Sequence, residues 1–409
     1  MHEVTAYGEI VLVVAATLYL ALLANKATER FPIPGPALFL IGAAVASELF
    51  PRLRTALPIL TVERLGVIAL IVILFDGGMH VGWARFRGAA VPVTVLGVLG
   101  TFGTAGGVTL AAHALFGFEW ITAGILGAAL APTDPAVMFS VLGKREIGGR
   151  AGTILEGESG ANDPVGIALM IGMLDYATHA HATFWTVVRE FAVEMSVGLA
   201  IGVAGALILL PALRRVSMPH EAHYPLRTLA AAGVVYGVAA VAHGSGFIAV
   251  FVAGLLLGSA EVPLKREIER FHTSLASLAE IVVFVALGLT IDLGGLDAHD
   301  VWLDGILLAL ILAFVARPLV AGVLLVPTRL RPGERVFVLW GGLKGAVPIL
   351  LAAFAVIAKA EGAERIYGIV FVVVLFSVVV QGTSLPLLAS RLGVPMRTVR
   401  TSISDELTT

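Results

Sequence analysis

The stretch ITAGILGAALAPTDPAVMFSVL, residues 121–142, is an apolar run interrupted at its centre by two prolines that flank Thr133 and Asp134. A second apolar run, FVLWGGLKGAVPILLAAF (residues 337–354), is interrupted by glycines and Pro348 around Lys344. Proline removes a backbone donor and clashes with the preceding turn, so both runs predict helices that break midway. Backbone groups freed at mid-membrane depth are tolerated only where protein or water satisfies them. A pair of such breaks points to a transporter binding site.

The composition is that of a membrane protein. The chain has 409 residues, of which 58% are hydrophobic and 14% are charged, whereas soluble domains carry about 25% charged residues. Apolar runs of bilayer-spanning length recur along the chain. They predict an all-α polytopic membrane protein with about thirteen spans, near residues 8–25, 34–50, 65–80, 89–116, 120–142, 152–174, 186–211, 228–243, 246–260, 272–291, 301–326, 336–357 and 366–387.

These spans form one transmembrane domain, residues 1–390, followed by a short cytoplasmic tail, residues 391–409. The N-terminus lacks a basic region typical of a secretory signal. Cysteine is absent, which excludes disulfides and thiolate metal sites. No phosphate-binding loop is credible, so we expect no cofactor and no nucleic-acid partner.

The loop charges predict the orientation. Nineteen of the 27 Lys and Arg residues lie in loops on one side of the predicted spans and six on the other. Because basic residues concentrate in cytoplasmic loops, the N-terminus is expected outside and the C-terminus in the cytoplasm. The two basic residues that remain, Arg317 and Lys344, lie inside spans eleven and twelve.

We take nine charged side chains of the predicted spans as intramembrane charges. Each costs roughly 2.5–3.5 kcal/mol at a helix centre, and such residues usually face the bundle interior and mark ion or proton pathways. Some can instead lie near a helix end and reach water, an alternative that stays open for Glu156 and Glu194. The nine are Asp76, Asp134, Glu156, Glu158, Asp163, Glu194, Glu280, Arg317 and Lys344.

The two breaks lie seven spans apart and therefore run in opposite directions through the bilayer, as inverted repeats of spans 1–6 and 8–13 require. We expect spans five and twelve to be discontinuous helices that cross near the midplane. Asp134 would then offset the positive N-terminal ends of the half-helices, and Lys344 the negative C-terminal ends. Two ordinary proline kinks are the alternative, which a charge at both breaks disfavours.

Span six carries the stretch LEGESGANDPVGIALMIG, residues 155–172. On a helix, Ser159 and Asp163 share a face at i, i+4, and so do Glu158 and Asn162. A hydroxyl and a carboxylate on one face are hard oxygen ligands suited to an alkali cation. One site that binds either a proton or a cation, never both, is sufficient for antiport.

The chain resembles bacterial members of the cation–proton antiporter superfamily, in the branch of Na⁺/H⁺ exchangers and cell-volume-regulation-type K⁺/H⁺ antiporters. The resemblance covers nearly the whole chain. It rests on ILFDGGMH in span three, APTDPAVMFSVLG in span five and EGESGANDPVGIAL in span six, with support from HGSGFIAVFVAGLLLG, ERVFVLWGGLKGAVPILLA and VVQGTSLPLLA.

The resemblance implies that Asp163 binds cation and proton in turn. Asn162 occupies the position of a second aspartate in the electrogenic branch, so the resemblance implies electroneutral exchange of one cation for one proton. It further implies an alkali-cation site built from Asp163, Ser159 and Thr133, with Asp134 contributing a second carboxylate. Asp76 matches an acidic residue that helps to form the site in some relatives.

The resemblance also implies a structural ion pair between Glu158 and Lys344, at a position where the family commonly has arginine. Lysine keeps the charge and loses the planar fork. Glu280 stands where an uncharged polar residue is expected. It either pairs with Arg317 or adds to the acidic lining.

The sequence therefore predicts an electroneutral antiporter that exchanges Na⁺ (or Li⁺) for H⁺ by alternating access, and K⁺:H⁺ exchange is the alternative. A cation channel or uniporter needs an open pore, which fits a single titratable aspartate less well. A symporter for an organic anion conflicts with the acidic site. The resemblance implies a homodimer in the plasma (inner) membrane, in contact with lipid.

Overall fold

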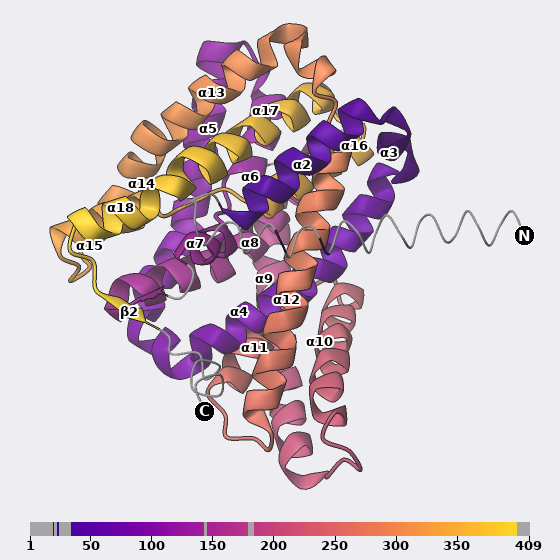
Figure 1. Cartoon of the computed structure of the whole chain (residues 1–409), viewed down its shortest axis with the longest axis vertical. Coiled ribbons are helices and arrows are strands. Elements are labelled where there is room, and N and C mark those ends of the chain that lie inside the picture. The colour runs from indigo at the N-terminus through magenta and orange to yellow at the C-terminus, as the bar shows by residue number, and fades with distance from the viewer. Residues whose placement is uncertain (1–18, 20–22, 24–33, 143–144, 179–183, 399–409) are drawn as a thin grey trace, which may run out of the picture.

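In the computed structural model, residues 34–142, 145–178 and 184–398 are described, together with Tyr19 and Leu23. This part of the chain is almost entirely helical (Figure 1). The first predicted span, residues 8–25, lies largely outside the described residues. The other twelve predicted spans are each matched by helix, so the fold class is confirmed.

The helices of the first half are α2 Gly35–Leu49, α3 Pro51–Ala56, α4 Ile59–Val95, the π-helical η1 Leu96–Gly100, α5 Thr101–Phe116, α6 Trp120–Leu130, α7 Pro135–Leu142 and α8 Gly149–Thr178. Those of the second half are α9 Phe184–Arg215, α10 His223–Val241, α11 Gly246–Gly258, α12 Lys265–Leu289, the 3₁₀ helix η2 Gly294–Asp300, α13 Val301–Ile311, the π-helical η3 Leu312–Ala316, α14 Arg317–Leu324, α15 Pro332–Trp340, α16 Ala346–Ile357, α17 Ala363–Phe376, the π-helical η4 Ser377–Gly382 and α18 Thr383–Arg391.

The two broken spans are those that the sequence predicts. Span five is α6 and α7 with a break between them, and span twelve is α15 and α16 with a break between them. Spans four and eleven, also seven apart, each contain a π-helical turn, η1 and η3. Spans three and four are joined in α4, which kinks at Gly82, where φ is 64°.

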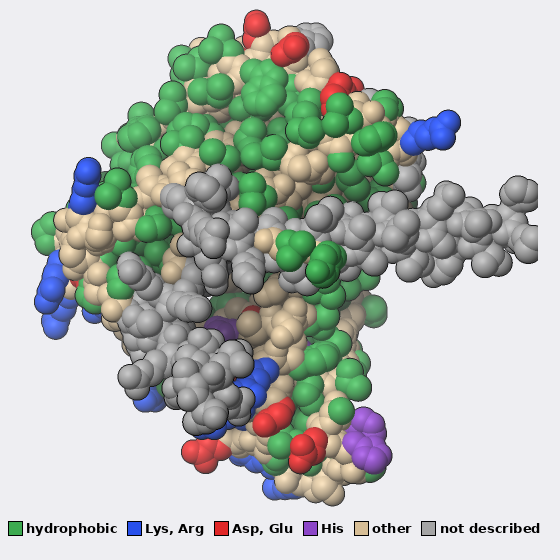
Figure 2. Space-filling model, in the orientation of Figure 1, with side chains coloured by type: hydrophobic (Ala, Val, Ile, Leu, Met, Phe, Trp, Pro, Cys, Tyr) green, Lys and Arg blue, Asp and Glu red, His purple; other side chains and the backbone are tan. Residues whose placement is uncertain are grey.

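The exposed surface is largely apolar, as contact with a lipid bilayer requires. Within the described residues, five helices are individually long and apolar enough to cross a membrane. Apolar side chains point outward on several of them; Ile208 is 72% exposed and Val241 is 83% exposed. Figure 2 shows hydrophobic side chains over much of one face, with Lys, Arg, Asp and Glu gathered towards its edges. The chain is a multi-pass membrane protein.

A short β-ribbon joins the start of the predicted tail to the loop before α8. Strand β1, Arg145–Ile147, pairs antiparallel with β2, Met396–Thr398. Next to the ribbon, the Gly148 amide donates to the Pro395 carbonyl at 2.7 Å. Hydropathy gave no sign of this pairing, because both strands are three residues long and polar.

Helices α4 and α11 pack with their backbones in contact. A Cβ added at Gly78 would overlap the Phe251 carbonyl oxygen, and one added at Gly254 would overlap the Phe75 carbonyl oxygen. Gly258 stands against Met79 in the same way. Small residues at i and i+4 allow this approach between membrane helices. The contact fixes the segment of α4 that carries Asp76.

We predict that Gly78→Ala destabilises the protein, whereas the neighbouring Gly77→Ala does not. Nothing lies within 4 Å of a Cβ at Gly77. Forcing a methyl group into a tight helix contact costs about 1–3 kcal/mol. Thermal unfolding in detergent, followed by fluorescence-detected gel filtration, compares the two variants. Equal melting temperatures would contradict the close α4–α11 contact.

Candidate functional site

The break in span five frees carbonyl groups at the end of α6. Helix α6 ends at Leu130, and α7 begins at Pro135. Pro132 and Pro135 have no N–H group, so neither can continue the hydrogen-bond ladder of α6. The carbonyls of Ala131 and Pro132 therefore point into the protein at the negative end of the half-helix.

The break in span twelve is shaped by glycines. Residues 341–345 separate α15 from α16, and Gly345 adopts φ −129° and ψ −138°. A Cβ at Gly345 would overlap the Asp134 carboxylate, and a Cβ at Gly342 would overlap the Arg317 guanidinium. The two glycines thus let charged side chains approach the backbone.

The two breaks contact each other directly. Lys344 Nζ donates to the Ala131 carbonyl at 2.9 Å and to the Pro132 carbonyl at 2.8 Å. The Asp134 amide donates to the Leu343 carbonyl at 2.8 Å. Asp134 Oδ2 in turn accepts from the Ala346 amide at 3.2 Å, at the N-terminus of α16. The expected crossing, with a lysine at a negative helix end and an aspartate at a positive one, is confirmed.

Helix α8 holds Thr133 from the side. Asn162 Nδ2 donates to Thr133 Oγ1 at 2.7 Å, and the Thr133 amide donates to Asn162 Oδ1 at 3.3 Å. Ser159 Oγ donates to the Thr133 carbonyl. All three side chains are buried. Both ends of the Asn162 amide are used to position the break, so in this structure Asn162 acts as a clamp on Thr133.

Asp163 is a buried acid whose hydrogen bonds are incomplete. Its residue is 4% exposed, and its Oδ1 has no hydrogen-bond partner within the described residues. The charged groups that act on it are Asp134 and Lys344. Ser159 lies one turn earlier on α8. A buried carboxylate with an open oxygen next to a hydroxyl and a broken helix can accept a proton or a small cation.

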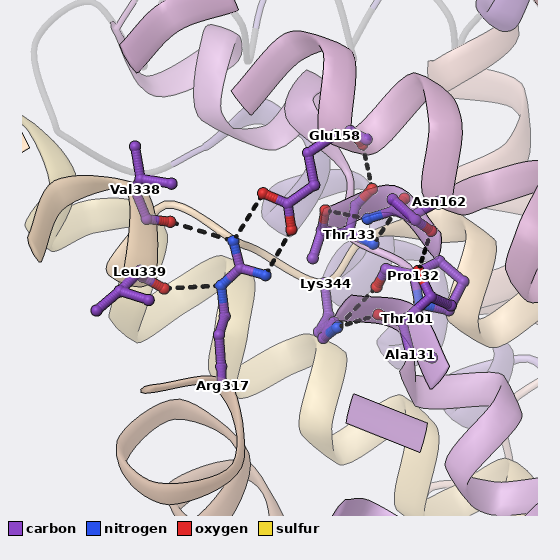
Figure 3. A network of polar contacts seen from close by, with 12 residues as sticks. Thr101, Ala131, Pro132, Thr133, Glu158, Asn162, Arg317, Val338, Leu339 and Lys344 are labelled. Atoms are coloured by element: carbon purple, nitrogen blue, oxygen red, sulfur yellow. Dashed lines mark hydrogen bonds and ion pairs between the residues drawn. The ribbon is translucent and has the colours of Figure 1, made fainter. Parts of the chain in front are cut away.

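Glu158 is paired with Arg317, so the predicted Glu158–Lys344 ion pair is wrong. Arg317 Nη1 and Nη2 donate to the two carboxylate oxygens of Glu158 at 2.8 and 3.2 Å (Figure 3). The same guanidinium donates to the carbonyls of Leu339 and Val338, at 2.8 and 3.1 Å. A planar fork can serve a carboxylate and two carbonyls together, whereas an ammonium acts as a point charge.

Each half-helix that ends at a break therefore has a basic side chain bound to its C-terminal carbonyls. Lys344 caps the carbonyl end of α6, and Arg317 caps the carbonyl end of α15 (Figure 3). A cation at a helix C-terminus is favourable because it opposes the helix dipole. Arg317 needs Glu158 as a counter-charge, whereas Lys344 lies near Asp134 and Asp163.

Glu280 lies apart from Arg317, so that suggested pairing is also wrong. Its Oε1 is buried without a hydrogen-bond partner in the described residues, and the charged group that acts on it is Asp134. The other alternative, that Glu280 adds to the acidic lining, stays a prediction.

Asp76 forms a separate cluster. His80 Nδ1 lies 3.4 Å from Asp76 Oδ2, and Thr273 Oγ1 donates to Asp76 Oδ1 at 3.2 Å. Glu156 lies 3.8 Å from Arg85, beside this cluster. The described contacts of Asp76 do not include Thr133, Ser159 or Asp163.

Two residues that support the second break were not identified from the sequence. Ser377 Oγ accepts from the Lys344 amide and donates to Gln381 Oε1, both at 2.8 Å. Both lie in the π-helical η4 and are buried. Their polarity within a strongly apolar span was the signal that could have identified them.

Arg317→Ala should lower the free energy of unfolding by about 3–5 kcal/mol, because it leaves the Glu158 carboxylate buried and unpaired. The double variant Arg317→Met/Glu158→Met should recover part of the loss, since apolar replacement of both partners is often near neutral. Thermal unfolding in detergent measures both effects.

Arg365 provides the matched control for this comparison. Its side chain is 32% exposed and pairs with Asp304 at 2.7 Å. Arg365→Ala should cost less than Arg317→Ala, because the Arg365–Asp304 pair is more exposed to solvent than the Arg317–Glu158 pair. If Arg317→Ala and Arg365→Ala lowered the melting temperature equally, the Glu158–Arg317 pair would not be the buried brace that the geometry indicates.

Comparison with known proteins gives a consistent result. The family model of the transmembrane sodium/hydrogen exchangers matches residues 12–391. The chain is 34% identical over 383 residues to the K(+)/H(+) antiporter NhaP of Alkalimonas amylolytica, covering 92% of this chain and 65% of that protein. It is 28% identical over 413 residues to the Na(+)/H(+) antiporter NhaH of Halobacillus aidingensis, covering 96% and 98%.

The fold is also similar to a solved structure. The sodium proton antiporter MjNhaP1 of Methanocaldococcus jannaschii superposes with a TM-score of 0.80 at 24% identity, covering 93% of this chain and 98% of that one. The chain covers 63–65% of the length of the K(+)/H(+) relatives named here and in the same group.

Proposed function

The chain belongs to the transmembrane sodium/hydrogen exchanger family, and on this premise we propose that it exchanges a monovalent alkali cation for a proton by alternating access. The observation that carries the proposal is Asp163, a buried carboxylate with an open oxygen beside two broken helices. A carboxylate removed from water cannot remain charged and uncompensated, so it must hold either a proton or a cation. Antiport requires only that the proton and the cation compete for this one carboxylate.

The ligands around Asp163 suit an alkali cation. Ser159 Oγ uses its proton on the Thr133 carbonyl, so the lone pairs of the hydroxyl remain available. The Thr133 carbonyl and the Asp134 carboxylate lie at the same crossing. Hard cations of this class prefer oxygen donors such as these. Asn162 contributes by holding Thr133 in place.

Lys344 has two tasks in this proposal. It neutralises the carbonyl end of α6, and it acts electrostatically on Asp163. In this proposal Lys344 and Asp134 offset each other and Glu280 keeps its proton, so Asp163 carries the remaining charge of the crossing. Binding one monovalent cation or one proton there keeps the loaded site neutral, which supports electroneutral exchange.

The sequence and the family support a proposal for the orientation of the chain in the membrane and for its assembly. The bias of basic loops places the N-terminus outside and the C-terminus in the cytoplasm of a plasma (inner) membrane. We expect a homodimer in which the bundle of broken helices moves past a fixed partner domain. In this proposal the protein is a transporter and has no enzyme activity.

Na⁺, with Li⁺ alongside it, is our first choice of cation, and K⁺ is the second candidate. The second is favoured by the 34% identity to a relative named as a K(+)/H(+) antiporter. A channel is disfavoured because Asp163, Thr133 and Ser159 are each at most 4% exposed.

Asp163→Asn should abolish exchange in proteoliposomes, because an amide cannot carry a proton on and off the site. The assay imposes a pH gradient, adds Na⁺, Li⁺ or K⁺ in turn, and follows a pH-sensitive dye. Glu194→Gln is the matched control, since Glu194 lies on α9, which forms neither break. Full activity in Asp163→Asn would refute Asp163 as the exchanging group.

Exchange should be unaffected by an imposed membrane potential, because one charge moves each way. The rate of cation-driven proton movement would be measured in proteoliposomes at several potentials with the ion gradients held constant. With the two ion gradients balanced, cation uptake driven by an inside-positive potential would show that more than one proton leaves per cation that enters.

A further inference from the structure

A group of arginines surrounds the start of α15, away from the two breaks. Two lie in the loop between α14 and α15, one lies in the first turns of α15, and one ends α18. The two segments touch, because a Cβ added at Gly333 would lie 2.5 Å from the Leu392 carbonyl oxygen. Figure 2 shows Lys and Arg side chains, with hydrophobic side chains next to them, at the edge where Figure 1 places α15. The members of this arginine group are Arg329, Arg331, Arg335 and Arg391.

The arginine group has no acidic partner in the part of the chain that the structure describes. None of its members forms an ion pair there. The acid next to them, Glu334, uses its Oε2 to accept from the Arg331 amide at 2.8 Å. Arg335 is half-buried, and its Nε is buried without a hydrogen-bond partner among the described residues. A half-buried charge is unfavourable without a counter-charge, so the arginine group is suited to bind an anion.

A second basic region, at the ends of α9 to α12, is compensated by the protein itself. Residues 212–270 carry six Lys and Arg side chains and four Glu side chains. Arg227 donates to three carbonyls near the end of α9, and Lys265 lies 3.9 Å from Glu269. Both regions are predicted to lie on the cytoplasmic side, where basic residues are common. The lack of compensation is therefore what distinguishes the arginine group.

Exposed apolar side chains continue from the arginines along the same helices. Leu387 on α18 is 55% exposed and stands four residues before Arg391, on the same helix face. Val336 on α15 is 48% exposed. Val326 is 63% exposed and stands three residues before Arg329. Positive side chains at the end of a lipid-facing apolar surface lie at the level of the headgroups.

We propose that the arginine group binds the phosphate of an anionic phospholipid, such as phosphatidylglycerol, from the leaflet on the side of the C-terminus. The planar fork of arginine donates two parallel hydrogen bonds to a phosphate. The acyl chains of the same molecule cover Leu387, Val336 and Val326. A free phosphate matches the charge of this surface, whereas a lipid matches both its charge and its apolar part.

The bound headgroup has a structural consequence. By bridging Arg331 and Arg391 it holds the start of α15 against the end of α18. Helix α15 leads to the break of span twelve, so the lipid stabilises the part of the fold that carries this break. The inference goes beyond antiport and does not depend on it.

The combined variant Arg329→Gln/Arg331→Gln/Arg391→Gln tests the site, because all three side chains are exposed. Purified protein in a neutral detergent is titrated with phosphatidylglycerol or phosphatidylcholine and unfolded thermally. Saturating phosphatidylglycerol should raise the wild-type Tm by about 5 °C relative to phosphatidylcholine. In the variant most of this shift should disappear, and half-saturation should need about tenfold more lipid or beyond.

The matched control is Arg215→Gln/Arg266→Gln/Arg270→Gln, which removes the same charge from exposed side chains of the compensated region. It should keep the wild-type response to phosphatidylglycerol. Equal loss of the response in both combined variants would refute the site, since the lipid would then be sensing surface charge in general.

Two further measurements separate the lipid from other anions and binding from stability. Inorganic phosphate should leave the wild-type Tm unchanged, and a shift as large as that of phosphatidylglycerol would refute a lipid site. Native mass spectrometry counts the bound lipid directly, and the wild type should retain more phosphatidylglycerol than the arginine-group variant. Equal retention would overturn the proposal. None of these measurements requires transport, so the antiport proposal and the lipid site can fail independently.

Discussion

Two helices that stop in the middle of the membrane impose the constraint on which this structure depends. At each break, carbonyl groups lose their helical partners in a place where water cannot replace them. The protein satisfies them with positive side chains, Lys344 at the end of α6 and Arg317 at the end of α15. Each cation then requires a negative group, because an unpaired buried charge is strongly unfavourable. The intramembrane charges are a consequence of the broken backbone.

The local sequence follows from that requirement. Gly342 and Gly345 have no side chain because Arg317 and Asp134 occupy the space. Asn162 donates to Thr133 Oγ1 and accepts from the Thr133 amide, and an amide makes both contacts without adding a charge to the crossing. The arrangement leaves Asp163 with an open oxygen.

Most of the fold could be predicted from the sequence because hydropathy, proline positions and loop charge are local properties. The ends of the breaks were also predictable, since helix dipoles fix which charge belongs at which end. The partner of Glu158 was not predictable. Arg317 follows the π-helical turn η3, which changes the direction in which later side chains point. The spacing of residues in the sequence predicts neither that turn nor the contact between the Arg317 guanidinium and α15. The contact between Asp76 and His80, by contrast, follows from their i, i+4 spacing on α4.

The same energetics would account for coupling in the antiport that we propose. In that proposal Lys344 and Asp134 offset each other, and Asp163 holds either a proton or a cation. An empty, ionised Asp163 crossing the membrane would carry a charge without compensation, and removing an ion from water costs several kcal/mol even after relaxation. A penalty of about 4 kcal/mol would make that form about a thousandfold rarer than the loaded ones. Only the protonated and cation-bound forms then cross at a useful rate. Strict exchange needs no gate that recognises both ions; it requires only that the carboxylate be buried where the two broken helices meet.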